Sequence, residues 1–170
     1  MSRPLVAILM GSDSDLPIMN EASEVLKEFG VAYEIHVLSA HRSPHLVAEF
    51  AAQAQAKGLK VFICGAGGAA HLAGVVAAHT TLPVIGVPVD STPLNGMDAL
   101  LATVQMPAGI PVATVAVGKP GARNAGLLAV QMLGLADHGL SKKLLAFKKR
   151  LAEGVRDKDE KLQKQRTQSK

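Results

Sequence analysis

Five short apolar runs alternate along this chain with longer segments in which apolar residues recur at helical spacing. Short apolar runs are typical of buried strands, and two parallel strands need a crossover, usually a helix, between them. The first two helical segments end at Gly30 and Gly58, and glycine commonly ends helices. The pattern therefore predicts a parallel sheet with helices between its strands. The predicted strands are Leu5–Met10, Val31–Leu38, Leu59–Cys64, Pro83–Val89 and Pro111–Val117.

The segments between these runs carry signals for helix starts. Ser14 or Asp15 can cap the first helix, with Pro17 in its first turn, and Ser43-Pro44 repeats the arrangement before the second. Together the elements predict a three-layer α/β fold, a flavodoxin-like parallel sheet in the order 2-1-3-4-5 with an appended C-terminal helix. The later helices are predicted over Ala69–His79, Asp98–Val104 and Ala122–Leu135.

The composition supports a sheet that is buried on both faces. Hydrophobic residues make up 48% of the 170 residues but aromatic residues only 3%, so Ala, Val, Leu and Ile must build the core. The single cysteine, Cys64, excludes an intrachain disulfide and lies in an apolar run, where we expect it to be buried. Leu5–Met10 is too short for a signal-peptide core, and no stretch reaches the roughly 18 apolar residues of a membrane helix. These features predict a cytoplasmic protein with no membrane partner.

Most of the positive charge lies at the C-terminal end. From Lys142 to Lys170 there are eleven Lys or Arg and four Asp or Glu, a net charge of +7, whereas the remainder carries −3. The chain has no Trp and one Tyr, so it lacks the aromatic side chains on which nucleic-acid bases stack. We therefore interpret the charge as a solvated helix face, with a nucleic-acid-binding arm as the minor alternative, and predict no nucleic-acid partner.

The same region is predicted to be a separate part of the chain, with residues 1–137 as the flavodoxin-like domain and 138–170 as a helical extension with a polar tail. An apolar stripe on such a helix needs a partner surface, which we expect another copy of the chain to supply. Beyond about Arg156 the composition becomes strongly polar and predicts disorder. The stripe consists of Leu140, Leu144, Leu151 and Val155.

Three loops with complementary chemistry follow the first three predicted strands. Gly11–Asp15 offers hydroxyls, carboxylates and N–H groups at a helix start, and Ser39–Arg42 adds an imidazole and a guanidinium. Gly65–Gly68 has almost no side chains, so its backbone can approach a flat ring closely. In the order 2-1-3 the carboxyl ends of these strands meet at one edge, where open α/β sheets bind ligands. The sequence therefore predicts a site for a phosphorylated small molecule at that edge.

His41 is the candidate for proton transfer at this site. Histidine is the residue type whose ordinary pKa lies near physiological pH, so an imidazole can both donate and accept a proton. His41 stands at a strand end beside Arg42, a cation that suits phosphate, whereas the other histidines are interpreted as structural, with His71 intermediate. Ser12 and Asp15 alone would be interpreted as turn and cap residues. No Cys/His spacing typical of a zinc site is present.

Four motifs, in their order and spacing, resemble those of one family, the bacterial 5-(carboxyamino)imidazole ribonucleotide mutases of purine biosynthesis. The resemblance runs from about Leu5 to Leu135, and the tail after His138 is similar only in being helical and polar. The motifs are Gly11-Ser12-Asp13-Ser14-Asp15, Ser39-Ala40-His41-Arg42-Ser43-Pro44, Gly65-Ala66-Gly67-Gly68-Ala69-Ala70-His71-Leu72 and the segment from Val104 to Thr114.

The resemblance implies a homo-octamer that acts on a ribonucleotide without a cofactor. It implies an isomerase in which His41 is the general acid/base that moves a carboxylate from the exocyclic nitrogen to a ring carbon. It further implies that Ser12 and Arg42 bind the 5′-phosphate and Asp15 the ribose. The residues implied to border the imidazole ring are Ser39, Ala40, Gly67, Ala70 and Leu72.

Two alternatives stay open at this point. The sister branch of the family, which carboxylates aminoimidazole ribonucleotide directly with carbon dioxide, typically carries Lys where this chain has Arg42, so Arg42 favours the mutase. Leu16, where many relatives have Trp, departs from the family pattern and predicts an altered pocket wall. The other alternative is a non-catalytic nucleotide- or flavin-binding module on the same fold. The adjacent His41 and Arg42 and the scarcity of aromatic residues argue against such a module.

Overall fold

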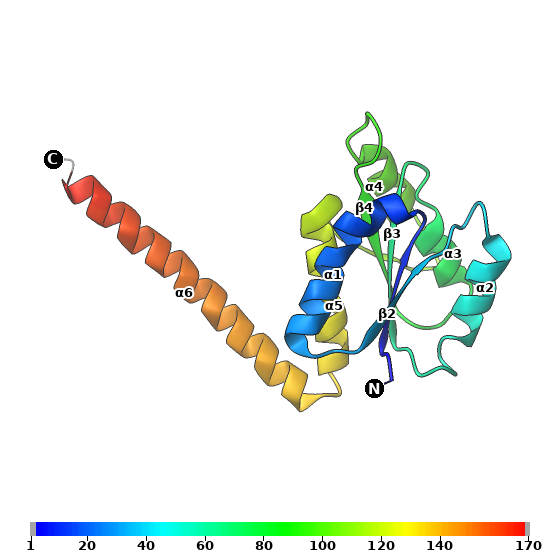
Figure 1. Cartoon of the computed structure of the whole chain (residues 1–170), viewed down its shortest axis with the longest axis horizontal. Helices are drawn as coiled ribbons and strands as arrows, with labels where there is room; N and C mark the ends of the chain where they lie inside the picture. The colour runs from blue at the N-terminus through cyan, green and yellow to red at the C-terminus, as the bar shows by residue number, and fades with distance from the viewer. Residues whose placement is uncertain (1–2, 169–170) are drawn as a thin grey trace. The chain divides into compact units, whose positions relative to one another are not determined.

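The computed structural model describes residues 3–168, and five strands within them form one parallel sheet in the order β2-β1-β3-β4-β5 (Figure 1). This confirms the predicted fold class and strand order. The two central strands, β1 and β3, are buried along most of their length, as expected where helices cover both faces. The strands are β1 (Val6–Met10), β2 (Tyr33–Val37), β3 (Val61–Gly67), β4 (Val84–Val89) and β5 (Ala113–Thr114).

Two helices, α1 (Leu16–Phe29) and α5 (Gly118–Gly134), cover one face of the sheet (Figure 1). A side chain at Gly65 of β3 would collide with Met19 of α1, so this helix lies directly on the sheet. The two helices also pack closely on each other, since a Cβ at Gly126 of α5 would lie 2.9 Å from the Ala22 carbonyl oxygen. Small residues thus hold this layer tightly against the strands.

Three helices cover the opposite face: α2 (Pro44–Gln53), α3 (Leu72–Ala78) and α4 (Met97–Val104). A buried cluster joins Leu9 and Phe62 of the central strands to Val47 of α2 and Leu72 of α3. Burial of such side chains stabilises the fold by roughly 1.5–3 kcal/mol each. Because Leu72 also begins α3 at the pocket edge, the same packing fixes the end of the sheet that carries the site.

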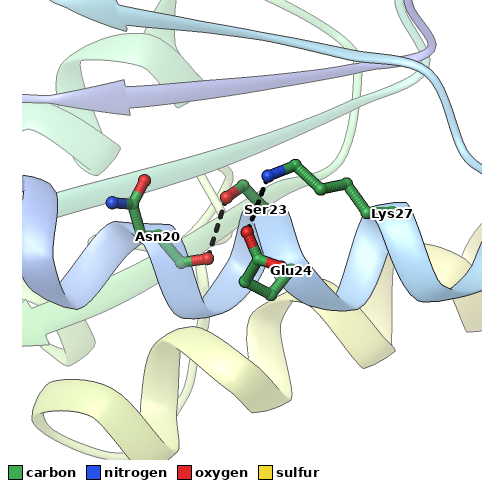
Figure 2. Close-up of polar contacts among 4 residues, drawn as sticks. All are labelled: Asn20, Ser23, Glu24 and Lys27. Carbon is green, nitrogen blue, oxygen red and sulfur yellow. Dashed lines mark hydrogen bonds and ion pairs between the residues drawn. The ribbon is translucent and has the colours of Figure 1, made fainter.

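Figure 2 shows two polar contacts between residues of α1, one buried and one exposed. The hydroxyl of Ser23, which is buried, donates to the Asn20 carbonyl oxygen at 2.8 Å, so this buried group is satisfied within the helix. The pair of Lys27 and Glu24, 2.6 Å apart, is exposed, and water screens ion pairs of this kind so that they add little stability. Gly30 ends the helix with φ +74°, a left-handed conformation that glycine adopts without strain.

The structure corrects the predicted boundary between the third strand and the following helix. β3 extends past Cys64 to Gly67, because its backbone stays paired with β4 as far as the Gly67–Val89 pair. α3 begins at Leu72 rather than at Ala69, since Gly68 adopts φ +60° and starts a turn. The glycine-rich segment therefore belongs partly to the sheet, which holds its backbone in place.

Two further boundaries differ from the prediction. The last strand is shorter than Pro111–Val117, because only Ala113 and Thr114 pair with β4. α5 begins at Gly118 instead of Ala122, and Pro120 fits within its first turn, where a missing N–H leaves no bond unmade.

The chain divides into two compact units between Met132 and Leu133. The second unit consists mainly of α6 (His138–Gln168), whose start is capped by Asp137 Oδ1, an acceptor for the Gly139 N–H at 2.7 Å. The disorder predicted beyond Arg156 is wrong as far as Gln168, because the helix continues there, while the last two residues lie outside the described part. The domain boundary at 137/138 stays a prediction. Over residues 3–168, no helix has the length and hydropathy needed to span a bilayer.

Candidate active site

A cavity of about 370 Å³ lies at the carboxyl ends of β1, β2, β3 and β4. The three loops singled out in the sequence meet there, because the first three strands are neighbours in the sheet. The volume suits a small-molecule ligand. Eight of the nine predicted site residues line this cavity: Ser12, Asp15, Ser39, Ala40, His41, Arg42, Gly67 and Leu72.

Ser12 organises the loop that follows β1. Its hydroxyl oxygen accepts hydrogen bonds from the Ser14 N–H at 3.3 Å and from the Ser14 hydroxyl at 2.9 Å. These bonds cap η1 (Asp13–Asp15), the single turn before α1. The loop thus presents a compact group of hydroxyls at a helix start, which suits the oxygens of a phosphate.

Asp15 is the buried acid of this loop, with only 6% of its surface exposed. Burial raises the pKa of its carboxyl above the ordinary value, although hydrogen bonds from Ser12 and Ser14 and the charge of Arg42 act in the opposite direction. Its oxygens are acceptors at the pocket wall, and acceptors of this kind suit the hydroxyls of a sugar.

The loop after β2 holds Arg42 through local hydrogen bonds. The Ser39 hydroxyl accepts from the Arg42 backbone N–H at 3.2 Å, and Ser43 Oγ donates to the Ser39 carbonyl at 3.0 Å. The guanidinium then reaches the neighbouring loop, where Nη2 donates to the Gly11 carbonyl oxygen at 2.7 Å. A guanidinium has five N–H donors, so others stay free to bind an anion beside Ser12.

Two histidines from different loops are in direct contact in the pocket. His41 Nε2 lies 2.8 Å from His71 Nδ1, and the two rings meet edge to face with centroids 4.9 Å apart. At this separation one of the two nitrogens carries the proton and the other accepts the bond. The contact fixes the orientation of the His41 ring, which otherwise sits on a connecting loop.

Gly67 ends β3 at a crowded point of the pocket wall. A Cβ at this position would lie 1.9 Å from the Ser91 hydroxyl oxygen, so a side chain here would displace Ser91. Both residues line the cavity. The missing side chain of Gly67 therefore leaves room for a hydroxyl from the loop after β4. The close approach of a flat ring to this backbone stays a prediction.

The ninth predicted residue, Ala70, is buried and is not among the residues that line this cavity, while its neighbours Ala69 and Leu72 are. Three polar lining residues, Ser14, His71 and Ser91, were not predicted as site residues. Their position in the sequence could have indicated them, because each follows a strand whose carboxyl end lies at this edge of the sheet. Among the described residues, no group of three or more His, Cys, Asp or Glu is arranged to hold a metal ion.

Comparisons with known proteins give a consistent result. The family model described as AIR carboxylase matches residues 5–154. A protein of Bacillus subtilis named N5-carboxyaminoimidazole ribonucleotide mutase is 58% identical over 142 residues, which cover 84% of this chain and 88% of that protein. A protein of the same name from Mycobacterium tuberculosis (strain H37Rv) is 56% identical, with 95% of this chain and 92% of that protein covered. The crystal structure of Treponema denticola PurE matches with a TM-score of 0.85 and 32% identity, covering 94% of this chain and 99% of that chain.

Proposed function

Because this chain belongs to the AIR carboxylase family, we propose that it is an isomerase of purine biosynthesis with the activity of an N5-carboxyaminoimidazole ribonucleotide mutase. It moves the carboxylate of its substrate from the exocyclic nitrogen to the ring carbon and so forms 4-carboxy-5-aminoimidazole ribonucleotide. The observation that carries this proposal is that relatives with the mutase name are more than half identical over nearly the whole chain.

The pocket residues support a way of holding this ribonucleotide. Arg42 and Ser12 lie next to each other through the bond from Arg42 to Gly11, and they bind the 5′-phosphate. Asp15 accepts hydrogen bonds from the ribose hydroxyls. The imidazole ring then lies against the backbone of Ser39 and Ala40 on one side and of Gly67 on the other, with Leu72 as an apolar contact.

His41 serves as both acid and base in the reaction we propose. It gives a proton to the exocyclic nitrogen, the bond from this nitrogen to the carboxyl carbon breaks, and carbon dioxide is released within the pocket. The ring carbon of the resulting amino-imidazole attacks the carbon dioxide and forms the new carbon–carbon bond. The ring carbon then returns its proton to His41, so that protons and electrons balance over the cycle. Positioning of the two reactants in one enclosed site supplies the remaining acceleration.

A turnover assay tests the proposal. The chain is incubated without ATP either with N5-carboxyaminoimidazole ribonucleotide or with aminoimidazole ribonucleotide and bicarbonate. We expect efficient conversion of the first substrate. Efficient use of only the second would assign the chain to direct carboxylation, the alternative that the name of the family model favours. Failure of both reactions would leave a non-catalytic nucleotide-binding module.

We further propose that the chain assembles as a homo-octamer in the cytoplasm. Several large apolar side chains are exposed on the surface, and a subunit interface is the usual place for such a surface. Native mass spectrometry gives the subunit number directly, and a monomer at micromolar concentration would refute the octamer. The exposed side chains include Leu94, Met97, Leu101 and Val104.

A further inference from the structure

The loop after β4 contributes one residue, Ser91, to the lining of the pocket. This residue follows β4, lines the cavity and is exposed, and its hydroxyl makes no side-chain hydrogen bond within the described residues. The hydroxyl lies where a side chain of Gly67 would project, 1.9 Å from the position of a Cβ at that glycine. A hydroxyl group with both its donor and its acceptor capacity unused therefore stands next to the backbone of Gly67, at the end of β3.

The segment after Ser91 is a turn with its own hydrogen bonds. The Thr92 hydroxyl donates to Asp98 Oδ2 at 2.7 Å and accepts from the Leu94 N–H at 3.2 Å. The turn closes through Asn95 and Gly96, both with positive φ, and leads into α4. The backbone of Ser91 is thus held between β4 and an ordered turn, which keeps its side chain at the pocket wall.

The strand order determines which part of a ribonucleotide Ser91 faces. Neighbouring strands lie about 4.8 Å apart, so the end of β4 is about 10 Å across the sheet from the end of β1. The phosphate-binding side chains, Ser12 and Arg42, belong to the loops after β1 and β2. A nucleotide with its phosphate there directs its base towards β3 and β4, past the contact of His41 and His71.

We infer that the Ser91 hydroxyl is a positioning group for the migrating carboxyl group, to which it donates a hydrogen bond. The inference rests on the proposed mutase function and assigns it a residue beyond those predicted. Carbon dioxide is uncharged after the first bond breaks, so little holds it in the pocket. A donor at the reactive edge of the ring keeps it near the carbon that must attack, and this donor then binds the carboxylate of the product.

The test compares wild type and Ser91→Ala. It measures how much of the bound aminoimidazole ribonucleotide is carboxylated to product and how much is released. Both proteins are given N5-carboxyaminoimidazole ribonucleotide, and the ring-carboxylated product and the released aminoimidazole ribonucleotide are quantified together. We expect Ser91→Ala to release about tenfold more of the decarboxylated nucleotide per product formed. Its affinity for aminoimidazole ribonucleotide, which lacks the carboxyl group, should stay within about twofold of wild type.

Two further variants sharpen the result. Ser91→Cys keeps the shape of the side chain but has only a weak donor, so it should also release more aminoimidazole ribonucleotide per product formed. This variant replaces Ser91→Ala in the test if the alanine variant folds poorly. Thr81→Ala removes a hydroxyl just before the other end of β4 and should behave as wild type.

Two outcomes overturn the inference while leaving the proposed function intact. One is an unchanged ratio of released nucleotide to product in both Ser91 variants. The other is an equal loss of affinity for the nucleotide with and without the carboxyl group, since Ser91 would then only shape the pocket. A wild-type chain that makes no product from the carbamate substrate would instead refute the proposed function, and the role of Ser91 with it.

Discussion

The two ends of the pocket are assembled in different ways. The anchor end, formed by Ser12, Asp15 and Arg42, is held mainly by hydrogen bonds between residues close in sequence, such as those from Ser14 to Ser12. The reaction end, formed by His41, His71 and Ser91, joins loops that follow three different strands. Apart from the bond from Arg42 to Gly11, the anchor end is therefore ordered by hydrogen bonds within single turns. The reaction end depends on the sheet to bring distant segments together.

This difference separates binding from turnover. In the proposed binding mode, groups at the anchor end touch parts of the substrate that do not react, so their contacts are equally strong before and during the reaction and affect affinity. In the same proposal, groups at the reaction end act on bonds that break and form, so a small change in their position affects the rate. Substitutions at the two ends should accordingly be told apart by whether kcat or KM changes.

The largest effect is expected for His41→Asn. General acid/base catalysis by a side chain is worth about 10²–10⁴-fold, and asparagine cannot exchange a proton at neutral pH. Turnover should fall by about 10³-fold, while the affinity for the ribonucleotide changes by less than about threefold. Single-turnover assays and calorimetric binding to the same variant measure the two quantities. Turnover within tenfold of wild type would remove His41 from its proposed role.

Arg42→Ala tests the anchor end. Loss of a charge-assisted hydrogen bond to phosphate costs about 1.5–3 kcal/mol, so KM should rise by roughly 10–100-fold while kcat changes little. Arg42→Lys is the matched control, because it keeps the charge but loses the forked geometry, and it should recover part of the affinity. A fall in kcat at saturating substrate with unchanged KM would place Arg42 at the reaction end instead.

The same contrast explains what the sequence could and could not predict. The spacing of the apolar residues and the glycines between segments predicted the sheet order. Local motifs predicted Ser12, Asp15, His41 and Arg42, all of which line the cavity. His71 and Ser91 were not predicted as site residues, because only the order of the strands brings their loops next to His41 and Gly67. Ala70, which only the family resemblance indicated, is buried just before α3 and does not line the cavity, so its role stays a prediction.

His71→Asn asks whether the reaction end needs both of its histidines. The variant loses the imidazole that touches His41 Nε2 at 2.8 Å, so the His41 ring is less well oriented. We expect kcat to fall by about tenfold with KM little changed, because the contact orients the His41 ring and does not bind the substrate. His79→Asn, at the end of α3 away from this pocket, is the control and should match wild type. A change in KM alone would assign His71 to substrate binding.

Asp15→Asn should have the smallest effect on activity and an opposite effect on stability. Asparagine keeps one acceptor oxygen for the ribose, so KM should rise by only about fivefold.

Burial holds the pKa of Asp15 above its ordinary value of 3.8, so folding favours the protonated carboxyl. The contribution of the Asp15 carboxyl to stability is therefore fully present below this ordinary value and is lost as pH rises through the raised pKa. Since asparagine does not titrate, the free energy of unfolding of Asp15→Asn should exceed that of wild type by more at about pH 7 than at about pH 3. Urea unfolding of both ligand-free chains at the two pH values measures this difference. If the wild type instead became more stable than Asp15→Asn as pH rises, the hydrogen bonds from Ser12 and Ser14 would outweigh the effect of burial on the pKa of Asp15. Burial of this carboxylate would then not destabilise the anchor end.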